Sequence, residues 1–328
     1  QQPNQMKKLI LFTTVLIFIL FNLSAQKQKV IFDCDLGGDI DDAFAVALLL
    51  SSQEEFEILG LCMDHGNTPG RGQVAAKMLY ETGLENIPIY LGRHTPTVVG
   101  KDTKLEGKST QMLWAEDFNL LRPQTKPASD FIIETLNKYP GEVVLFTVGP
   151  VDNIADVIDK DPEALKKAKQ VVSMFGSIEI GYGGGQANAE WNVVASVEAG
   201  QKFMVSGANI TLAPLDITDH VIINDKYLNA IAMRNTPLTD AISSLYALWY
   251  KHAPYAIKPK MFDGVAVGMI LWPELFETKE AFVFVDENGF TKIDKNKEPN
   301  CTIGVKINDE EFLLRMSRRI ISQNFKRK

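Results

Sequence analysis

The segment that decides the fold is VIFDCDLGGDIDDA, residues 30–43. A short apolar run leads into five aspartates around a pair of glycines, and a second apolar run then extends to Leu50. This order predicts a buried strand, a tight turn and the start of a helix. Burying like charges this close together is costly unless a cation or hydrogen bonds compensate.

The aspartates of this turn allow three interpretations. In a solvated turn, a helix N-terminus would stabilise Asp41 and Asp42 by about 0.3–1 kcal/mol each, which is too little for five carboxylates. A cation held by Asp35 and Asp42 is favoured, and ligation by oxygen alone suits Ca²⁺, or alternatively Mg²⁺, rather than Zn²⁺. An Asp-x-Asp motif also occurs in phosphohydrolases of the haloacid-dehalogenase type, where one aspartate is a covalent nucleophile. The following pair Asp41-Asp42 argues against that third interpretation.

Strand-like and helix-like segments alternate along the rest of the chain. After the first strand, strands are expected at 57–63, 88–91, 143–148, 170–175 and 209–214, with helices at 73–81, 128–139, 151–159 and 196–206. Further helices are expected at 237–252, 265–271 and 309–324, with a hairpin over 282–293. We predict an α/β fold, a mainly parallel, doubly wound open sheet with helices on both faces and a small C-terminal hairpin and helix. Such sheets bind ligands at the carboxyl ends of their strands.

Composition and the N-terminus narrow the class of protein. The 328 residues are 45% hydrophobic and carry a formal net charge of −7, which argues against nucleic acid as a partner. Met6-Lys7-Lys8, the apolar run Leu9–Leu23 and Ala25 together predict a signal peptide over residues 1–25, with residues 1–5 upstream of the expected start. We therefore expect export, to a bacterial periplasm, no membrane anchor after cleavage, and a single domain over residues 26–328.

Polar motifs follow several of the predicted strands. Asn67 is either part of a turn or an amide that binds a hydroxyl group. Asp152, in the segment GPVDN, either caps a helix or offers its backbone carbonyl to a metal. A glycine-rich loop ends in Glu190-Trp191-Asn192, a combination of polar groups and an aromatic ring that suits a sugar. Asp263, ahead of an apolar helix, reads by itself as an N-cap.

Taken together and in this order, these motifs resemble the nucleoside hydrolases, the inosine–uridine-preferring nucleoside N-ribohydrolases. The resemblance spans roughly residues 30–270 and includes Asp33-Cys34-Asp35, Asp41-Asp42-Ala43, Gly66-Asn67, Gly149-Pro150, Ala189-Glu190-Trp191-Asn192 and Phe262-Asp263. It implies that Ca²⁺ is held by Asp35, Asp42, Asp263 and the backbone carbonyl of Asp152. It implies that ribose hydroxyls are bound by Asp41, Asn67, Glu190 and Asn192, with Gln186 as a further candidate.

The activity implied by the resemblance is hydrolysis of the N-glycosidic bond of a purine or pyrimidine ribonucleoside to base and ribose. A Ca²⁺-bound water would attack C1′ with Asp35 as general base, and the carboxylates would favour the charge of an oxocarbenium-like transition state. The small nucleoside would be the partner, and a homo-oligomer is expected. Tyr246 and Tyr250, which with Trp249 form an aromatic stripe, either contact the base or pack in the core.

The chain departs from the family pattern in three places, one of which is a glycine-rich loop before Glu190 that is shorter than usual. Two extra residues lie within Gly38-Asp39-Ile40, which leaves the role of Asp39 open. Phe262 stands where many pyrimidine-using members have a histidine that is thought to protonate the departing base. A catalytically weakened periplasmic protein that binds nucleosides or ribosyl compounds is therefore the second functional hypothesis. The sequence also leaves open whether Cys34 and Cys62 pair.

Overall fold

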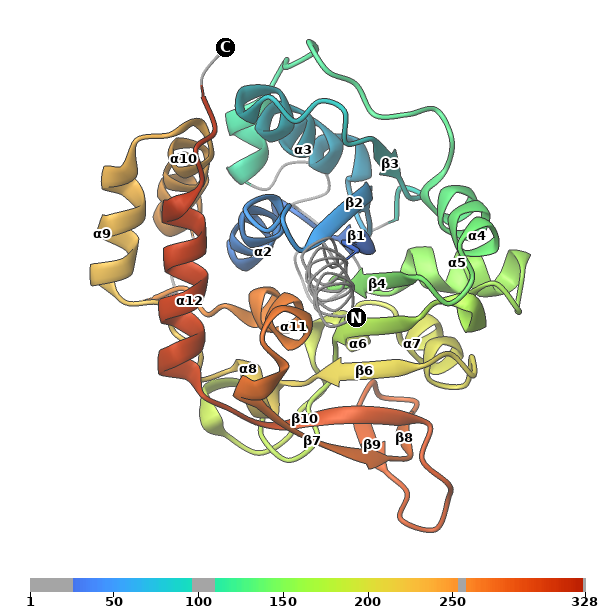
Figure 1. Ribbon diagram of the computed structural model, residues 1–328. Helices are drawn as coiled ribbons and strands as arrows, with labels where there is room; N and C mark the ends of the chain where they lie inside the picture. Colours follow the sequence, from blue (N-terminus) through green and yellow to red (C-terminus); the bar gives the residue numbers. More distant parts are fainter. Residues whose placement is uncertain (1–25, 96–109, 253–257, 327–328) are drawn as a thin grey trace, which may run out of the picture.

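The computed structural model describes residues 26–95, 110–252 and 258–326, and its centre is an eight-stranded sheet (Figure 1). The strand order is β3-β2-β1-β4-β5-β6-β10-β7, and every pairing is parallel except that of β7 with β10. The strands are β1 (Gln28–Cys34), β2 (Phe56–Met63), β3 (Ile89–Leu91), β4 (Val143–Thr147), β5 (Gln170–Met174), β6 (Ile210–Ala213), β7 (Phe276–Ala281) and β10 (Cys301–Ile307). The predicted signal peptide lies outside the described residues.

Helices cover both faces of this sheet, because its central strands are apolar on both sides (Figure 1). On one side of the sheet lie α2 (Asp41–Leu50), α3 (Thr68–Thr82), α10 (Pro237–His252), α11 (Phe262–Leu271) and α12 (Asp309–Ser322). Helix α9 (Asp225–Arg234) packs outside them, against α10 and α12. The other face packs against α4 (Ala128–Lys138), α5 (Asp152–Lys160) and α7 (Val197–Met204). The predicted doubly wound α/β fold is confirmed.

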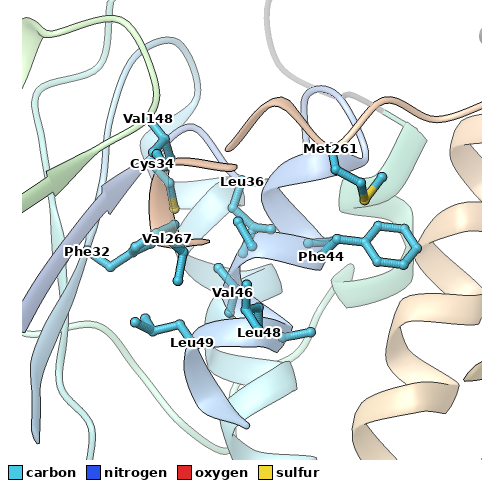
Figure 2. Close-up of a cluster of buried hydrophobic side chains, with 14 of the residues drawn as sticks. Phe32, Cys34, Leu36, Phe44, Val46, Leu48, Leu49, Val148, Met261 and Val267 are labelled. Atoms are coloured by element: carbon cyan, nitrogen blue, oxygen red, sulfur yellow. The ribbon is translucent and has the colours of Figure 1, made fainter. Parts of the chain in front are cut away.

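Helix α2 is the centre of the larger apolar cluster. All ten of its residues are buried, so it has no solvated face, and Figure 2 shows Phe44, Val46, Leu48 and Leu49 among side chains from β1 and α11. A helix that is apolar on all sides is stable only when other elements surround it. This packing fixes the first turn of α2, where Asp41 and Asp42 lie.

Most expected elements are present, and the differences have physical reasons. The strands expected at 57–63, 88–91, 143–148, 170–175 and 209–214 end within one residue of those observed, and the hairpin is formed by β8 (Val283–Val285) and β9 (Thr291–Ile293). Helix α3 begins at Thr68 rather than at residue 73, because the Asn67 side chain caps it by accepting the N–H of Gly70. Strands β7 and β10 and helix α9 were not predicted. The sequence of β7, FETKEA, is charged, as is typical of a protected edge strand.

The two cysteines left open by the sequence do not pair. Cys34 belongs to the apolar cluster on one face of the sheet and Cys62 to the cluster on the other, and both are free. Their strands are neighbours, but Cys34 is in register with Met63, so Cys62 points the opposite way. In the part of the chain that the structure describes, no helix combines the length and apolar character needed to span a bilayer.

Close packing of α11 on α12 generates a prediction about Gly268. A Cβ at this position would lie 2.5 Å from Cε2 of the buried Phe312 ring, so Gly268→Ala is expected to lower the free energy of unfolding by about 1–3 kcal/mol. In the same helix, a Cβ at Gly264 meets only ordinary contacts, the nearest at 3.4 Å, so Gly264→Ala is the matched control. The control should be neutral or up to about 1 kcal/mol more stable. Urea unfolding of both variants checks this, and equal stabilities would contradict the packing.

Candidate metal and sugar site

The candidate site lies where the strand order reverses, between β1 and β4. In an open α/β sheet this reversal leaves a crevice at the carboxyl ends of the strands. Asp33 and Asp35 come from the end of β1, and α2, α5 and α11 place Asp41, Asp42, Asp152 and Asp263 in their first turns. Helix N-termini favour negative charge, which offsets part of the repulsion among these carboxylates.

Three buried carboxylates converge at this point. One oxygen from each of Asp41, Asp42 and Asp263 lies within 4.8 Å of the other two, and each residue is at most 4% exposed. The Asp263 N–H donates to Oδ2 of Asp41 at 3.2 Å, which joins the start of α11 to the start of α2. Burial, together with repulsion from the neighbouring carboxylates, raises the pKa of all three well above the ordinary range.

The donor set fits a hard divalent cation. Within the described residues, Oδ1 of Asp42 is buried and accepts no hydrogen bond, so it keeps a lone pair for another ligand. All the converging atoms are carboxylate oxygens, the donors that Ca²⁺ and Mg²⁺ prefer. The structure therefore brings Asp42 and Asp263 together as expected, and the carboxylate that completes the group is Asp41, which the resemblance assigned to ribose.

Asp35 lies beside this group and is held by an arginine that sequence reasoning missed. The buried Arg71, from α3, places Nη2 3.4 Å from Oδ2 of Asp35. Its Nε donates to the backbone oxygen of His65 at 2.8 Å and its Nη1 to that of Leu36 at 3.2 Å. One guanidinium group thus fixes the carboxylate and the turn after β1. The available signal was a lone arginine among small residues at the start of α3.

The side chain of Asp152 is bound in a polar network. It accepts hydrogen bonds from Ser196 Oγ at 2.7 Å and Arg93 Nη2 at 3.1 Å, and it lies 2.9 Å from Nδ1 of His65. Burial acts to raise its pKa, but the contacts with His65 and Ser196 outweigh this and lower it. Metal ligation by Asp152 would thus fall to its backbone carbonyl, as expected from the sequence, and this role stays a prediction.

Asp33 and Asp64 form hydrogen bonds that connect the elements around the site. Asp33 accepts from Asn153 Nδ2 at 2.7 Å, and Asp64 accepts the N–H groups of His65, Asp152 and Asn153. Burial raises the pKa of Asp33 to about 7, although the hydrogen bond from Asn153 opposes the shift. These bonds tie the ends of β1 and β2 to the start of α5.

Glu190 and Asn192 lie next to the ends of β4 and β5. The Asn192 amide donates to the backbone oxygens of Val148 and Met174, both at 2.9 Å. The Glu190 carboxylate accepts the N–H groups of Gly176 at 3.0 Å and Asn192 at 2.9 Å. Both predicted sugar-binding residues are thus buried and held rigidly at the crevice.

The other predicted contact residues are placed differently. Asn67 uses its side chain to cap α3, and Gln186, in the glycine-rich loop, is exposed. Tyr246 and Tyr250 lie next to each other on α10 with tilted rings whose centroids are 5.8 Å apart, and Tyr250 is exposed. The sugar-binding role of the first two and the base-binding role of the tyrosines stay predictions.

The inserted turn containing Asp39 is anchored to two elements that come later in the chain. Gln111 Nε2 donates to the backbone oxygens of Gly38 at 2.9 Å and Asp39 at 2.8 Å. The Asp39 carboxylate is hydrogen-bonded to Ile40 N–H and to the side chain of Trp249 from α10. The insertion therefore attaches α10, with its aromatic residues, to the acidic turn.

The fold and the site define an α/β protein with an acidic, all-oxygen donor group beside the buried polar residues Glu190 and Asn192. The model of the family "Inosine-uridine preferring nucleoside hydrolase" matches residues 30–314, and the chain belongs to this family. It is 30% identical to an uncharacterized protein of Schizosaccharomyces pombe, over 79% of this chain and 85% of that protein. It is 26% identical to the pyrimidine-specific ribonucleoside hydrolase RihB of Escherichia coli O157:H7, over 88% of this chain and 95% of RihB.

Solved structures show the same fold. A plant nucleoside hydrolase superposes with a TM-score of 0.75 at 23% identity, covering 90% of this chain and 99% of that one. A purine-preferring ribonucleoside hydrolase from Gardnerella vaginalis superposes with a TM-score of 0.76 at 22% identity, covering 90% and 98%. The shared fold extends over nearly the whole length of both structures.

Glu190 provides a prediction about pH and stability. Burial raises its pKa from 4.5 to about 7, although hydrogen bonds from Asn192 and Gly176 oppose the shift. Because the pKa is higher in the folded state, the protonated carboxyl contributes stability below about pH 4.5. That contribution is lost as the pH rises towards 7, by about 1.4 kcal/mol per unit. Glu190→Gln removes this dependence.

Urea unfolding of the wild type and Glu190→Gln at about pH 5 and about pH 8 provides the measurement. The wild type is expected to lose stability relative to the variant at the higher pH. The exposed Glu287→Gln serves as the matched control. If the free energies of unfolding of the wild type and Glu190→Gln differ by the same amount at both pH values, the raised pKa of Glu190 is contradicted.

Proposed function

We propose that this protein hydrolyses the N-glycosidic bond of ribonucleosides to release base and ribose. The observation that carries the proposal is the convergence of Asp41, Asp42 and Asp263 at the strand-order reversal, with Asp35 beside them. Membership of the nucleoside hydrolase family supports the same reaction. The buried Glu190 and Asn192 supply polar groups for a sugar at the same crevice.

Ca²⁺ is the proposed metal, because the converging donors are all carboxylate oxygens. Asp42 and Asp263 would hold it, together with Asp35 and the backbone carbonyl of Asp152, and Asp41 is placed to contribute as well. When bound, the ion would lower the pKa of a water molecule and bind sugar hydroxyls.

The residues of the chain have distinct proposed roles in the reaction. Asp35 accepts the proton of the attacking water as general base, and Arg71 restricts its orientation. The neighbouring carboxylates favour the positive charge that develops on the ribosyl ring as the bond to the base stretches. The ion pair with Arg71 and the hydrogen bond from Asp263 N–H to Asp41 hold part of this group in place before the reaction.

Base preference is proposed to depend on aromatic residues of α10, α11 and the glycine-rich loop. Phe262 lies edge-on to Tyr182 with ring centroids 6.2 Å apart, and Tyr246 and Tyr250 line α10. Aromatic faces accept both purines and pyrimidines by stacking. The relatives include one named pyrimidine-specific and one named purine-preferring, so both classes of nucleoside belong in the assay.

A weakened, nucleoside-binding protein is the second candidate. The observation that favours it is Phe262, which places an apolar ring directly before Asp263. Calorimetry separates the two candidates, because a binding protein gives a stable heat of association whereas an enzyme gives continuous heat of turnover.

Export and assembly are further parts of the proposal. The apolar run Leu9–Leu23 supports export through a signal peptide cleaved near Ala25, and a homo-oligomer is proposed. N-terminal sequencing of the secreted protein and light scattering after size-exclusion chromatography test these two points. An uncleaved N-terminus or a monomer would contradict them.

Asp35→Asn tests the assignment of the general base. The wild type is expected to release base and reducing sugar from a panel of purine and pyrimidine ribonucleosides. The variant should lower kcat by about 10²–10⁴ at saturating calcium, because a positioned base contributes a factor of this size. A kcat within threefold of the wild type would remove Asp35 from this role, and no turnover by the wild type would overturn the proposed reaction.

Asp42→Asn and Asp263→Asn test the metal ligands. Each variant is expected to weaken calcium binding at least about 10-fold in a calorimetric titration, with a parallel loss of activity. In chelator both should be no less stable than the wild type, because each removes a buried charge that repels its neighbours. The surface variant Asp130→Asn is the control. Unchanged calcium affinity in both site variants would exclude the site.

A further inference from the structure

We propose that Tyr182 determines sugar specificity: its hydroxyl and the Glu190 carboxylate together bind one hydroxyl group of the ribosyl unit. The inference rests on the proposed function, because it concerns recognition of the sugar at the same site. Neither the motifs nor the family match singled out Tyr182, which lies in the glycine-rich loop before Glu190.

The position of the hydroxyl carries the proposal. The Tyr182 Oη accepts the N–H of Trp191 at 3.1 Å and donates to Oε1 of Glu190 at 3.4 Å. A bond of 3.4 Å is long for an O–H donor, whose usual range is about 2.5–3.0 Å. Tyr182 therefore makes only a weak bond to Glu190, and the two oxygens lie close enough together for one substrate hydroxyl to bond to both from the side.

The loop presents this side chain in a fixed conformation. Asn188 Oδ1 accepts the N–H of Tyr182 at 3.1 Å, and the buried Asp219 accepts those of Gly183 at 3.1 Å and Gly184 at 3.0 Å. Asp219 is in turn paired with Lys260, close to the start of α11. Because the loop is anchored on both sides, binding at Tyr182 requires little ordering of the chain.

The ring of Tyr182 joins the sugar side of the crevice to the metal side. It meets the Phe262 ring edge-on at an interplanar angle of 88°, and Phe262 directly precedes Asp263. Tyr182 is 44% exposed, whereas Glu190 is 2% exposed. Tyr182 is thus accessible to a ligand and lies beside a buried hydrogen-bond acceptor, as expected of a residue that contacts substrate.

The two groups are complementary partners for an alcohol. A carboxylate only accepts, whereas a tyrosine hydroxyl can donate as well as accept. A sugar hydroxyl that donates to Glu190 can therefore accept from Tyr182. A substrate without that hydroxyl forms neither of these two bonds and is therefore bound less tightly.

A substrate-by-variant cycle tests the proposal. kcat/KM is measured for a ribonucleoside that the wild type hydrolyses and for its 2′-, 3′- and 5′-deoxy analogues, with wild type and Tyr182→Phe. The variant should lose about 10-fold to 100-fold on the full ribonucleoside. For one of the three analogues, the kcat/KM of the variant should fall less than about threefold below that of the wild type. The hydroxyl missing from that analogue is then the one that Tyr182 binds. Tyr139→Phe, which makes the same chemical change in the turn after α4, is the control.

The outcomes separate this inference from the reaction itself. An equal loss on the ribonucleoside and all three analogues, or no loss at all, would overturn the role of Tyr182 while leaving hydrolysis intact. If the wild type hydrolyses no nucleoside, the proposed reaction fails, and the same cycle measured as Kd by calorimetry decides the role of Tyr182. No binding of any nucleoside would overturn both. Since Tyr182→Phe retains the ring, thermal unfolding within about 2 °C of the wild type is expected.

Discussion

The constraint on which the structure depends is the repulsion among carboxylates buried in one crevice. Asp41, Asp42 and Asp263 converge from two helices that begin at the same point, and Asp35 stands beside them. Two helix N-termini offset part of this unfavourable charge, and the rest calls for a cation. The apolar surroundings of α2 hold Asp41 and Asp42 in place despite this repulsion.

A polar layer behind the site keeps its reactive groups in position. Arg71 joins Asp35 to the turn after β1, and Asp64 and Asn153 join β1 and β2 to the start of α5. On the sugar side, Asp219 anchors the glycine-rich loop. Removing one partner from any of these contacts would lower the stability of the fold, because a buried polar group without a partner is unfavourable. The functional groups are thus rigid before any ligand binds.

The sequence was sufficient for most of the fold, although not for β7, β10 and α9, because periodicity and turn residues reflect local physics. The run from Val30 to Leu50 predicts a buried strand, a turn and a helix, and the later strands follow from apolar runs between turn residues. Side-chain direction in a turn is set by long-range contacts, so spacing could not tell that Asp41 would join Asp42. Arg71 and Tyr182 were missed for the same reason: their partners lie in other elements.

The account is tested most directly by titrating chelator-treated wild-type protein with calcium while base release from a ribonucleoside is followed. It predicts that activity rises with occupancy of one calcium per chain and that thermal stability rises over the same range, because the ion relieves the repulsion among Asp41, Asp42 and Asp263. Full activity in chelator, or the absence of saturable calcium binding, would contradict it.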